Sequence, residues 1–326
     1  MDRRHFIGMS AAGVAGTLLP VSAFAAPDPL NPPGIRTAGI RMLPVVGGKY
    51  KVWTKKIGSG ATKVLLLHGG PGFSHDYLEA MESFLPEAGI EFYYYDQLGS
   101  NNSDQPDDPS LWTLPRFVDE VEEVRRGLGL DQFVLYGHSW GGLLAIDYAL
   151  KYQPHLRGLV ISNMTAGIQS YLKRTAALKN LLPPARRARL DALEARQDFD
   201  NPEYEAIMME DLYPQVICRI KPWPEPVMRC FRVANLKIYN QMQGKSEFVV
   251  TGNLKDWERW DRLHEIPTRT LSIGAQYDEM DPDDMRRIAS LMPRARAAIC
   301  PNGSHMCMWD DQANYFHALV PFLKSL

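Results

Sequence analysis

The 326-residue sequence predicts an α/β fold with a mostly parallel central sheet, helices on both faces of the sheet, and a helical cap inserted between two strands. Two observations support this prediction. Short apolar runs alternate with helical patterns up to residue 164 and again from residue 265, which is typical of parallel strands joined by helices. Residues 165–264 instead show helical periodicity with few strand signals.

The core therefore comprises residues 35–164 and 265–326, and the cap comprises residues 165–264. A leading hairpin is expected around Gly47-Gly48, and the later strands alternate with helices. The expected strands are residues 40–46, 50–54, 64–67, 92–95, 133–136, 159–162, 268–273 and 297–300.

The most informative motif is GHSWGG at residues 137–142. It follows the apolar run at 133–136 and precedes an expected helix at 143–152. A G-x-S-x-G pattern between a strand and a helix places the serine on a tight turn that exposes its hydroxyl above a parallel sheet. The glycines allow neighbouring backbone to pass close to that turn. The motif predicts Ser139 as a nucleophile.

A glycine-rich loop, HGGPG at residues 68–72, follows the strand expected at 64–67. In a fold with a G-x-S-x-G turn, this loop supplies one backbone N–H of an oxyanion hole, here that of Gly70. The second N–H comes from Trp140, which follows Ser139 at the positive end of the helix. Each such donor typically contributes roughly 10²–10³ in rate.

Two late strands are each followed by a residue that can complete a catalytic triad. Asp278 comes after the strand at 268–273, and His305 comes after the strand at 297–300. The chain order Ser, Asp, His is that of the α/β-hydrolase fold. A serine hydroxyl needs a base to take its proton, and the base needs an acid to orient it.

Other acids follow the same strand and compete with Asp278 for this role. They are Glu279, Asp281, Asp283 and Asp284. Asp278 is preferred because it is the first acid after the strand. Asp281 and Asp283 flank Pro282, a pattern typical of the start of a helix.

Several histidines are interpreted as structural. The side chain of His138 is expected to point away from the Ser139 hydroxyl, and His264 precedes a late strand at the wrong end of the sheet. Loop, helix-end or surface positions are expected for His75, His155 and His317.

The N-terminus carries Arg3-Arg4, a weakly apolar stretch and then Ala23-Phe24-Ala25, an A-x-A cleavage pattern. Residues 1–25 are therefore predicted to be a twin-arginine export signal, followed by a Pro-rich linker at 26–34. The mature chain is expected in the bacterial periplasm without stable membrane insertion. The alternative is an uncleaved signal that anchors the chain in the inner membrane.

The composition does not indicate nucleic-acid binding, because the formal net charge is -2 and Lys/Arg-rich tracts are absent. The cysteines, Cys218, Cys230, Cys300 and Cys307, lack zinc-ligand spacing. Cys300 and Cys307 bracket the His305 loop, where either a disulfide or buried free thiols fit the sequence. The proposed chemistry needs neither a metal nor an organic cofactor. The sequence does not fix an oligomeric state.

Four further motifs, taken with those above, indicate a particular protein family. They are YDQLGS at 95–100, MQGKSEF at 242–248, TGNLKDW at 251–257 and GSHMCMWDD at 303–311. Together with HGGPG and GHSWGG, they show that the chain resembles the prolyl aminopeptidase (proline iminopeptidase) family of α/β-hydrolases, which includes the tricorn-interacting aminopeptidase. The similarity runs from roughly residue 35 to the C-terminus.

The resemblance implies a serine aminopeptidase that releases N-terminal proline, or another small residue, from short peptides. It also implies that Glu247 and Glu279 bind the free amino end of the substrate, and that Tyr239 faces the substrate. The alternative is an amidase or esterase that acts on amino-acid amides or small esters, since the triad is the same. Dehalogenase and epoxide hydrolase activities are excluded, because they need an aspartate where Ser139 stands.

Overall fold

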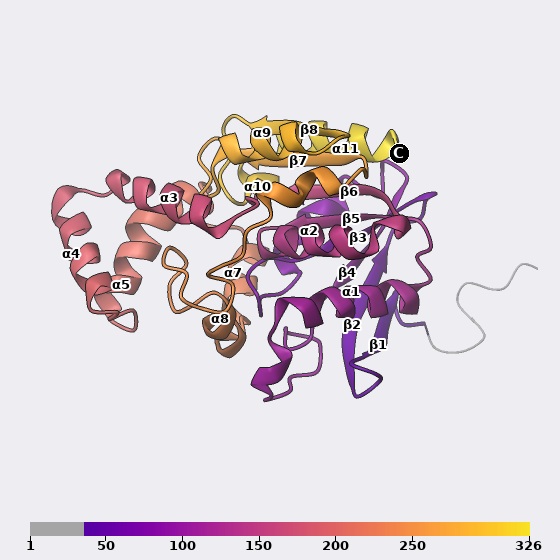
Figure 1. Cartoon of the computed structure of the whole chain (residues 1–326), viewed down its shortest axis with the longest axis horizontal. Coiled ribbons are helices and arrows are strands. Elements are labelled where there is room, and N and C mark those ends of the chain that lie inside the picture. Colours follow the sequence, from indigo (N-terminus) through magenta and orange to yellow (C-terminus); the bar gives the residue numbers. More distant parts are fainter. Residues whose placement is uncertain (1–35) are drawn as a thin grey trace, which may run out of the picture. The chain divides into compact units, whose positions relative to one another are not determined.

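The computed structural model describes residues 36–326, so the predicted export signal and the whole of the predicted linker lie outside the described residues. Eight strands form one sheet in the order β1-β2-β4-β3-β5-β6-β7-β8 (Figure 1). The strands are β1 (Ile40–Val45), β2 (Tyr50–Ile57), β3 (Thr62–Leu67), β4 (Ile90–Tyr95), β5 (Phe133–His138), β6 (Leu156–Ser162), β7 (Thr270–Ala275) and β8 (Ala295–Cys300).

The predicted leading hairpin is confirmed, because β1 pairs antiparallel with β2. Strand β2 also pairs antiparallel with β4, and all remaining pairs are parallel. The helical segments of the core are η1 (Asp76–Ser83), η2 (Pro109–Leu111), α1 (Leu114–Leu128), α2 (Trp140–Tyr152), η3 (Gln153–His155), α9 (Pro282–Leu291), α10 (Cys307–Asp310) and α11 (Gln312–Lys324).

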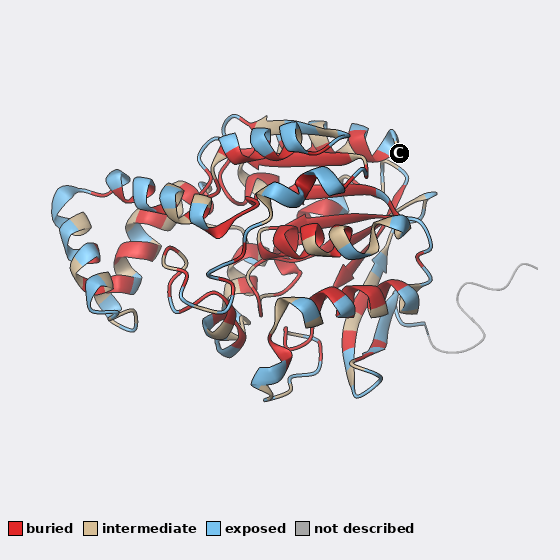
Figure 2. Ribbon diagram, viewed as in Figure 1, coloured by how far each residue is buried: buried red, intermediate tan, exposed pale blue. Residues whose placement is uncertain are grey.

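Strand β3 shows how the sheet separates two apolar layers. Leu65 and Leu67 belong to the layer that contains buried side chains of α1 and α2. Val64 and Leu66 face the opposite way, toward buried side chains of η1 and α11. Figure 2 shows the central strands buried and the outer faces of the flanking helices exposed. Successive side chains of a strand point to opposite faces, so a strand covered on both sides is apolar throughout.

All eight strands differ from those predicted by one to three residues at one end or both, and so does the start of α2. Two of these boundaries show the reason. Helix α2 begins at Trp140, three residues before the predicted start, because the chain enters the helix directly from the turn at Ser139. Strand β8 begins at Ala295 rather than Ala297, because Ala295 pairs with Thr270 on the neighbouring strand. Strand β8 is at the edge of the sheet and includes the exposed Arg296, so an apolar pattern does not register its first residues.

The chain between β6 and β7 is helical and lies beyond one end of the sheet, with α3, α4 and α5 at the left of Figure 1. Its segments are α3 (Ile168–Leu178), η4 (Lys179–Leu181), α4 (Pro184–Ala195), α5 (Pro202–Ala206), η5 (Ile207–Leu212), α6 (Tyr213–Val216), α7 (Glu225–Arg232), α8 (Leu236–Met242) and η6 (Trp260–Glu265). We refer to residues 165–264 as the cap.

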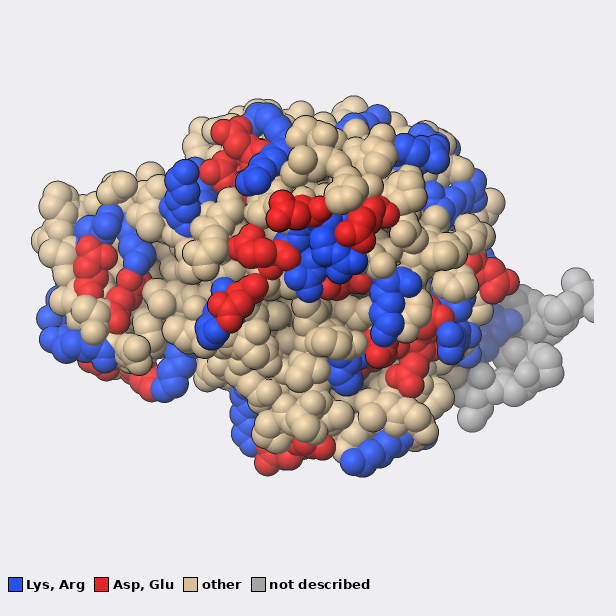
Figure 3. All heavy atoms as spheres, viewed as in Figure 1, with Lys and Arg blue, Asp and Glu red and all other residues tan. Residues whose placement is uncertain are grey.

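Acidic and basic side chains are interspersed on the face shown in Figure 3. Many surface charges are paired with a partner of opposite sign, as in the contact between Arg259 and Asp147 at 2.8 Å. Within residues 36–326, no helix has the length and apolar character needed to cross a bilayer.

Candidate active site

Ser139 occupies a strained turn between β5 and α2. Its backbone φ of 54° and ψ of -127° are unfavourable for a residue with a side chain. Hydrogen bonds hold the turn in place: the Ser139 N–H donates to the Ser162 carbonyl at 2.9 Å, and the Gly142 N–H donates to the Ser139 carbonyl at 2.7 Å. The turn is therefore fixed from both the neighbouring strand β6 and the helix that follows.

The glycines of the motif are required by close backbone contacts. A Cβ atom on Gly137 would lie 2.0 Å from the Gly141 carbonyl oxygen, and one on Gly141 would lie 2.3 Å from the Leu67 carbonyl oxygen. Neither position has room for a side chain. The G-x-S-x-G spacing thus follows from how tightly β5, α2 and the end of β3 meet at Ser139.

The glycine-rich loop runs directly past the serine. A Cβ atom on Gly69 would lie 3.0 Å from the Ser139 Cβ, and Gly70 has a φ of +39°. Among residues 36–326, no acceptor receives a hydrogen bond from the N–H of Gly70 or of Trp140, the first residue of α2. The first N–H groups of a helix have no partner within the helix. Two backbone donors are therefore free beside Ser139.

Gln97, in the YDQ motif, connects this loop to the serine turn. Its backbone N–H donates to Nε2 of His68 at 3.1 Å, and its side-chain oxygen accepts from the Trp140 indole at 2.9 Å. Tyr77 adds a second support, because its hydroxyl accepts from the Gly69 N–H and contacts Nδ1 of His138 at 3.0 Å. These contacts fix the spacing between Gly70 and Trp140.

Asp278 and His305 meet as the sequence predicted. Nδ1 of His305 lies 2.8 Å from Oδ1 of Asp278. The second carboxylate oxygen of Asp278 accepts from the side-chain amide of Asn163 at 2.7 Å. The backbone N–H of Met280 also donates to Oδ1 of Asp278 at 3.0 Å. Asp278 is therefore held so that it orients the imidazole of His305.

The competing acids have other partners. Asp281 accepts from the Asp283 N–H at 3.0 Å and so caps α9, and Pro282 occupies its first turn. The Asp283 side chain pairs with Arg286 at 2.6 Å, and Asp284 accepts from Thr165 at 2.6 Å.

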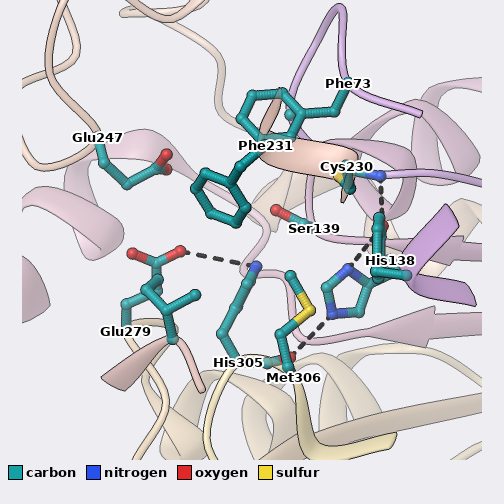
Figure 4. Close-up of a pocket in the computed structure, with 13 residues that line it drawn as sticks. Phe73, His138, Ser139, Cys230, Phe231, Glu247, Glu279, His305 and Met306 are labelled. Carbon is teal, nitrogen blue, oxygen red and sulfur yellow. Dashed lines mark hydrogen bonds and ion pairs between the residues drawn. The ribbon is translucent and has the colours of Figure 1, made fainter. Parts of the chain in front are cut away.

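The other ring nitrogen of His305 faces a second carboxylate. Nε2 of His305 lies 3.6 Å from Oε1 of Glu279 (Figure 4). Burial lowers the pKa of His305, but the charges of Asp278 and Glu279 outweigh this effect and raise it to about 9. His305 thus lies between two carboxylates and is stabilised as an imidazolium.

Glu279 and Glu247 form a pair of carboxylates bridged by a tyrosine. The Tyr171 hydroxyl lies 3.1 Å from Oε1 of Glu247 and 3.3 Å from Oε2 of Glu279. Tyr239 donates a hydrogen bond to the other oxygen of Glu247. Glu279 is only 1% exposed, and burial, followed by the charge of Glu247, raises its pKa well above the usual range. A cation placed between these carboxylates would relieve their repulsion.

A hollow of about 430 Å³ brings these groups together. Ser139, His305, Glu247 and Glu279 line it, and Figure 4 shows the two glutamates on the side away from His138. Its other walls are largely apolar and include Phe73, Tyr77, Ile217, Cys230, Phe231 and Met306. A second hollow of about 380 Å³ also touches Ser139, and its lining includes Gly70, Trp140, Tyr171, Tyr239 and Glu247. Seven of the eight site residues predicted from the sequence thus line these hollows. The eighth, Asp278, contacts His305 from behind.

Two histidines that the sequence analysis left out of the chemistry are buried. His75 lies in a loop, as expected, but it is 7% exposed, stacks on Trp53, and pairs with Asp96 at 2.8 Å. His138 lines the same hollow as Ser139. Both of its ring nitrogens are occupied, one by Tyr77 and the other by the His305 carbonyl at 2.9 Å. His138 therefore supports the site without serving as a free base.

The open alternatives for the cysteines are resolved in favour of thiols, since all four are buried and free.

A cluster of metal-ligand type is present elsewhere, where ligand atoms of His75, Asp76 and Glu79 lie within 4.8 Å of one another. Arg229 already contacts Asp76 at 2.6 Å and Glu79 at 2.5 Å. A guanidinium therefore balances the charge of this cluster.

Sequence reasoning missed three residues that shape the site: Tyr77, Asn163 and Tyr171. Asn163 follows β6 directly, at the edge of the sheet where functional loops gather, and this position is a usable signal. Tyr171 lies on α3, where helical periodicity identifies a buried face without indicating what that face contacts. Tyr77 lies in the 3₁₀ segment η1, and no motif marks it.

Comparison with known proteins agrees with this geometry. The family model described as alpha/beta hydrolase fold matches residues 62–312. The proline iminopeptidase of Elizabethkingia meningoseptica is 45% identical over 292 residues, which cover 87% of this chain and 98% of that protein. The proline iminopeptidase of Flavobacterium johnsoniae is 46% identical over 283 residues, covering 86% of this chain and 95% of that protein.

A solved structure shows the same likeness in three dimensions. The crystal structure of a proline iminopeptidase from Mycobacterium smegmatis superposes with a TM-score of 0.81 at 29% sequence identity, covering 88% of this chain and 98% of that one. The fold and the serine site define a member of the α/β hydrolases. Within that class, the chain belongs to the proline iminopeptidase family.

Proposed function

We propose that this protein is a prolyl aminopeptidase, a serine peptidase that releases N-terminal proline or another small residue from short peptides through an acyl-enzyme. One observation carries the proposal: the buried carboxylate of Glu279 and the half-buried carboxylate of Glu247 line the same hollow as Ser139 and His305. Two carboxylates shielded from water next to a nucleophile call for a cationic group on the substrate. The names of the relatives support the same activity.

In the proposed mechanism, the Ser139 hydroxyl attacks the scissile carbonyl while His305 takes its proton. Asp278 keeps the imidazole oriented and stabilises its charged form. The N–H groups of Gly70 and Trp140 stabilise the oxyanion. His305 then returns the proton to the leaving amine, and water releases the acyl group by the same steps. The residues need no metal or cofactor for this chemistry.

The carboxylates set the position at which the substrate is cut. An amino group held by Glu247 and Glu279 places the first peptide bond, and no later one, beside Ser139. Tyr239 keeps Glu247 in place through its hydrogen bond. The apolar walls formed by Phe73, Phe231 and Met306 suit a compact apolar ring or a small side chain.

The test compares three 4-nitroanilides, those of proline, alanine and N-acetyl-proline, with the purified protein. We expect rapid turnover of the free proline compound, slower turnover of the alanine compound, and at least about a hundredfold loss when the amine is acetylated, as expected for an unpaired buried charge. The variant Ser139→Ala serves as the control and should lose essentially all turnover.

Equal turnover of the free and acetylated proline compounds would instead indicate a general amidase or esterase. In that case Glu247 and Glu279 would have no role in substrate choice. Normal activity of Ser139→Ala would rule out the serine mechanism for either class.

The predicted periplasmic location is a separate proposal that rests on the sequence of residues 1–25 alone. Cell fractionation of the bacterial host, with and without replacement of Arg3 and Arg4 by lysine, tests it. We expect the unchanged chain in the periplasmic fraction and the replaced chain in the cytoplasm. Recovery of the unchanged chain with inner membranes would support the uncleaved anchor.

A further inference from the structure

The general base of the site faces a carboxylate as well as the nucleophile. Nε2 of His305, the atom that must accept the serine proton, lies at ion-pair distance from Glu279. We propose that Glu279 holds His305 as an imidazolium in the free enzyme, and that the substrate's ammonium group releases His305 by pairing with Glu279. This inference rests on the proposed function, because the releasing ligand is the amino end of the substrate.

The geometry fits an imidazolium better than a neutral ring. Asp278 lies 2.8 Å from one ring nitrogen and Glu279 lies 3.6 Å from the other. An imidazolium has an N–H donor on each nitrogen, whereas a neutral imidazole would turn a lone pair toward one of the carboxylates. The raised pKa of His305, about 9, agrees with this arrangement.

An imidazolium cannot act as the base. The Ser139 proton must move to a lone pair on Nε2, and that position already carries a proton in the charged ring. Within residues 36–326, no hydrogen bond joins the Ser139 hydroxyl to His305, so nothing in the free enzyme competes with the carboxylate for Nε2. In the free enzyme, His305 therefore cannot take the proton of Ser139.

The amino end of a substrate can undo this state. Glu247 and Glu279 both face the Tyr171 hydroxyl, at 3.1 Å and 3.3 Å, so one ammonium group can contact both carboxylates. Its charge offsets that of Glu279 and weakens the hold on the imidazolium. The Nε2 proton then leaves to water, and the freed lone pair can accept the proton of Ser139. One positive charge enters the site and one leaves it.

Other charged and titratable groups around His305 do not reverse this logic. Glu247, on the cap, adds to the effect of Asp278 and Glu279. His138, on β5, has its ring centroid 4.7 Å from that of His305, and burial lowers the pKa of His138 well below its usual range, so it stays neutral. Burial and the charge of Glu247 raise the pKa of Glu279, but the charge of His305 lowers it, and Glu279 in turn raises the pKa of His305. The imidazolium and the Glu279 carboxylate therefore favour each other's charged forms.

The experiment uses two substrates and two matched variants. The substrates are proline 4-nitroanilide, which has a free amine, and 4-nitrophenyl acetate, which has none. The variants are Glu279→Gln, which removes the charge next to His305, and Glu247→Gln, which removes the more distant one. Rates are measured from about pH 5 to about pH 10; kcat/KM reports the free enzyme, and kcat reports the substrate complex.

For the ester, we expect the acidic limb of kcat/KM to lie at high pH in the unchanged enzyme, and about one unit or more lower in Glu279→Gln. One unit corresponds to about a tenfold gain in neutral imidazole at pH 7. Glu279→Gln should thus hydrolyse the ester faster at pH 7, although it loses activity on the anilide. The ester limb of Glu247→Gln should move in the same direction but less than that of Glu279→Gln, because Glu247 has the smaller effect on His305. In the unchanged enzyme, the acidic limb of kcat for the anilide should lie at a lower pH than the acidic limb of kcat/KM for the ester.

An ester limb that is the same in Glu279→Gln and the unchanged enzyme would overturn this inference. Loss of anilide activity in both variants would still support the aminopeptidase in that case. Conversely, the ester limb could shift in Glu279→Gln while the unchanged enzyme shows no preference for a free amine. That result would support the effect of Glu279 on His305. It would also refute release by substrate and, with it, the proposed function.

Discussion

Asp278 and Glu279 are adjacent in the chain, yet they face opposite nitrogens of one imidazole. Asp278 has fixed partners, because Asn163 and the Met280 N–H both donate to it. Within residues 36–326, the one hydrogen-bond donor to Glu279 is the Tyr171 hydroxyl, which also contacts the backbone carbonyl and Oε1 of Glu247. The first carboxylate is therefore suited to orienting His305 permanently, and the second is suited to exchanging partners.

Tyr171→Phe tests the shared hydroxyl at this scale. The change removes a donor that both carboxylates contact, so that their position is less well fixed for the substrate's amine. A hydrogen bond to a charged group contributes about 1.5–3 kcal/mol, which corresponds to roughly a tenfold to hundredfold rise in KM for proline 4-nitroanilide. Hydrolysis of 4-nitrophenyl acetate should change little.

The matched control is Tyr148→Phe. Tyr148 is also a buried tyrosine that donates to a carboxylate, that of Glu122 at 2.9 Å, but it lies on α2 outside both hollows. We expect reduced thermal stability with an unchanged KM. Equal KM values for the two variants would mean that the Tyr171 hydroxyl has no role in amine binding.

At the scale of elements, one arginine ties the cap to the core. Arg229, on α7, contacts Asp76 at 2.6 Å and Glu79 at 2.5 Å, both on η1. The residues that follow it, Cys230 and Phe231, line the hollow beside Ser139. The ion pairs therefore set the position of one wall of the site.

Arg229→Met should displace that wall and leave the buried Asp76 carboxylate without its cation. The unpaired group costs about 1–3 kcal/mol of unfolding free energy, and kcat/KM for the anilide should fall about tenfold or more. Urea unfolding and steady-state kinetics measure the two effects. Arg232→Met is the control, because Arg232 lies on the same helix and pairs only with the exposed Glu225. A control that lost as much activity would remove the specific role of Arg229.

The sequence predicted the elements of the core well, because each catalytic residue follows an apolar strand. Ser139 comes after β5, Asp278 after β7 and His305 after β8, and parallel strands end at one edge of a sheet. The cap was less predictable. Its periodicity indicates helices, but not that Tyr171 reaches both carboxylates or that Arg229 reaches η1, since these contacts join residues far apart in the chain.

His75 illustrates the same limit for the core. It lies in a loop, as expected, but the sequence did not indicate that the structure buries it between Trp53 and Tyr94 with Asp96 as its partner. Composition and periodicity do not register a buried polar pair, because each member alone is typical of a surface residue.

For the whole molecule, stability should depend on pH in two separate windows. Burial opposes the charged form of Glu122, but hydrogen bonds from Arg125 and Tyr148 lower its pKa from 4.5 to about 2. This contribution is complete above pH 4.5 and is lost as pH falls toward 2. The raised pKa of His305 acts in the opposite sense: its contribution is complete below pH 6.5 and is lost as pH rises through about 9.

Unfolding by urea across this pH range measures both effects. We expect Glu122→Gln to be less stable than the unchanged protein at neutral pH, with the difference shrinking below pH 4.5. We expect the free energy of unfolding of His305→Gln to fall less than that of the unchanged protein on the alkaline side, and equally on the acidic side. Parallel curves for Glu122→Gln and the unchanged protein on the acidic side would exclude this carboxylate as a source of acid sensitivity.

The order of the strands also has a consequence for synthesis. Ser139 follows β5, near the middle of the sheet, whereas Asp278 and His305 follow β7 and β8, at one edge. A ribosome therefore makes the nucleophile long before the acid and the base. Until β8 has been made and has joined the sheet, the growing chain carries a serine without its base.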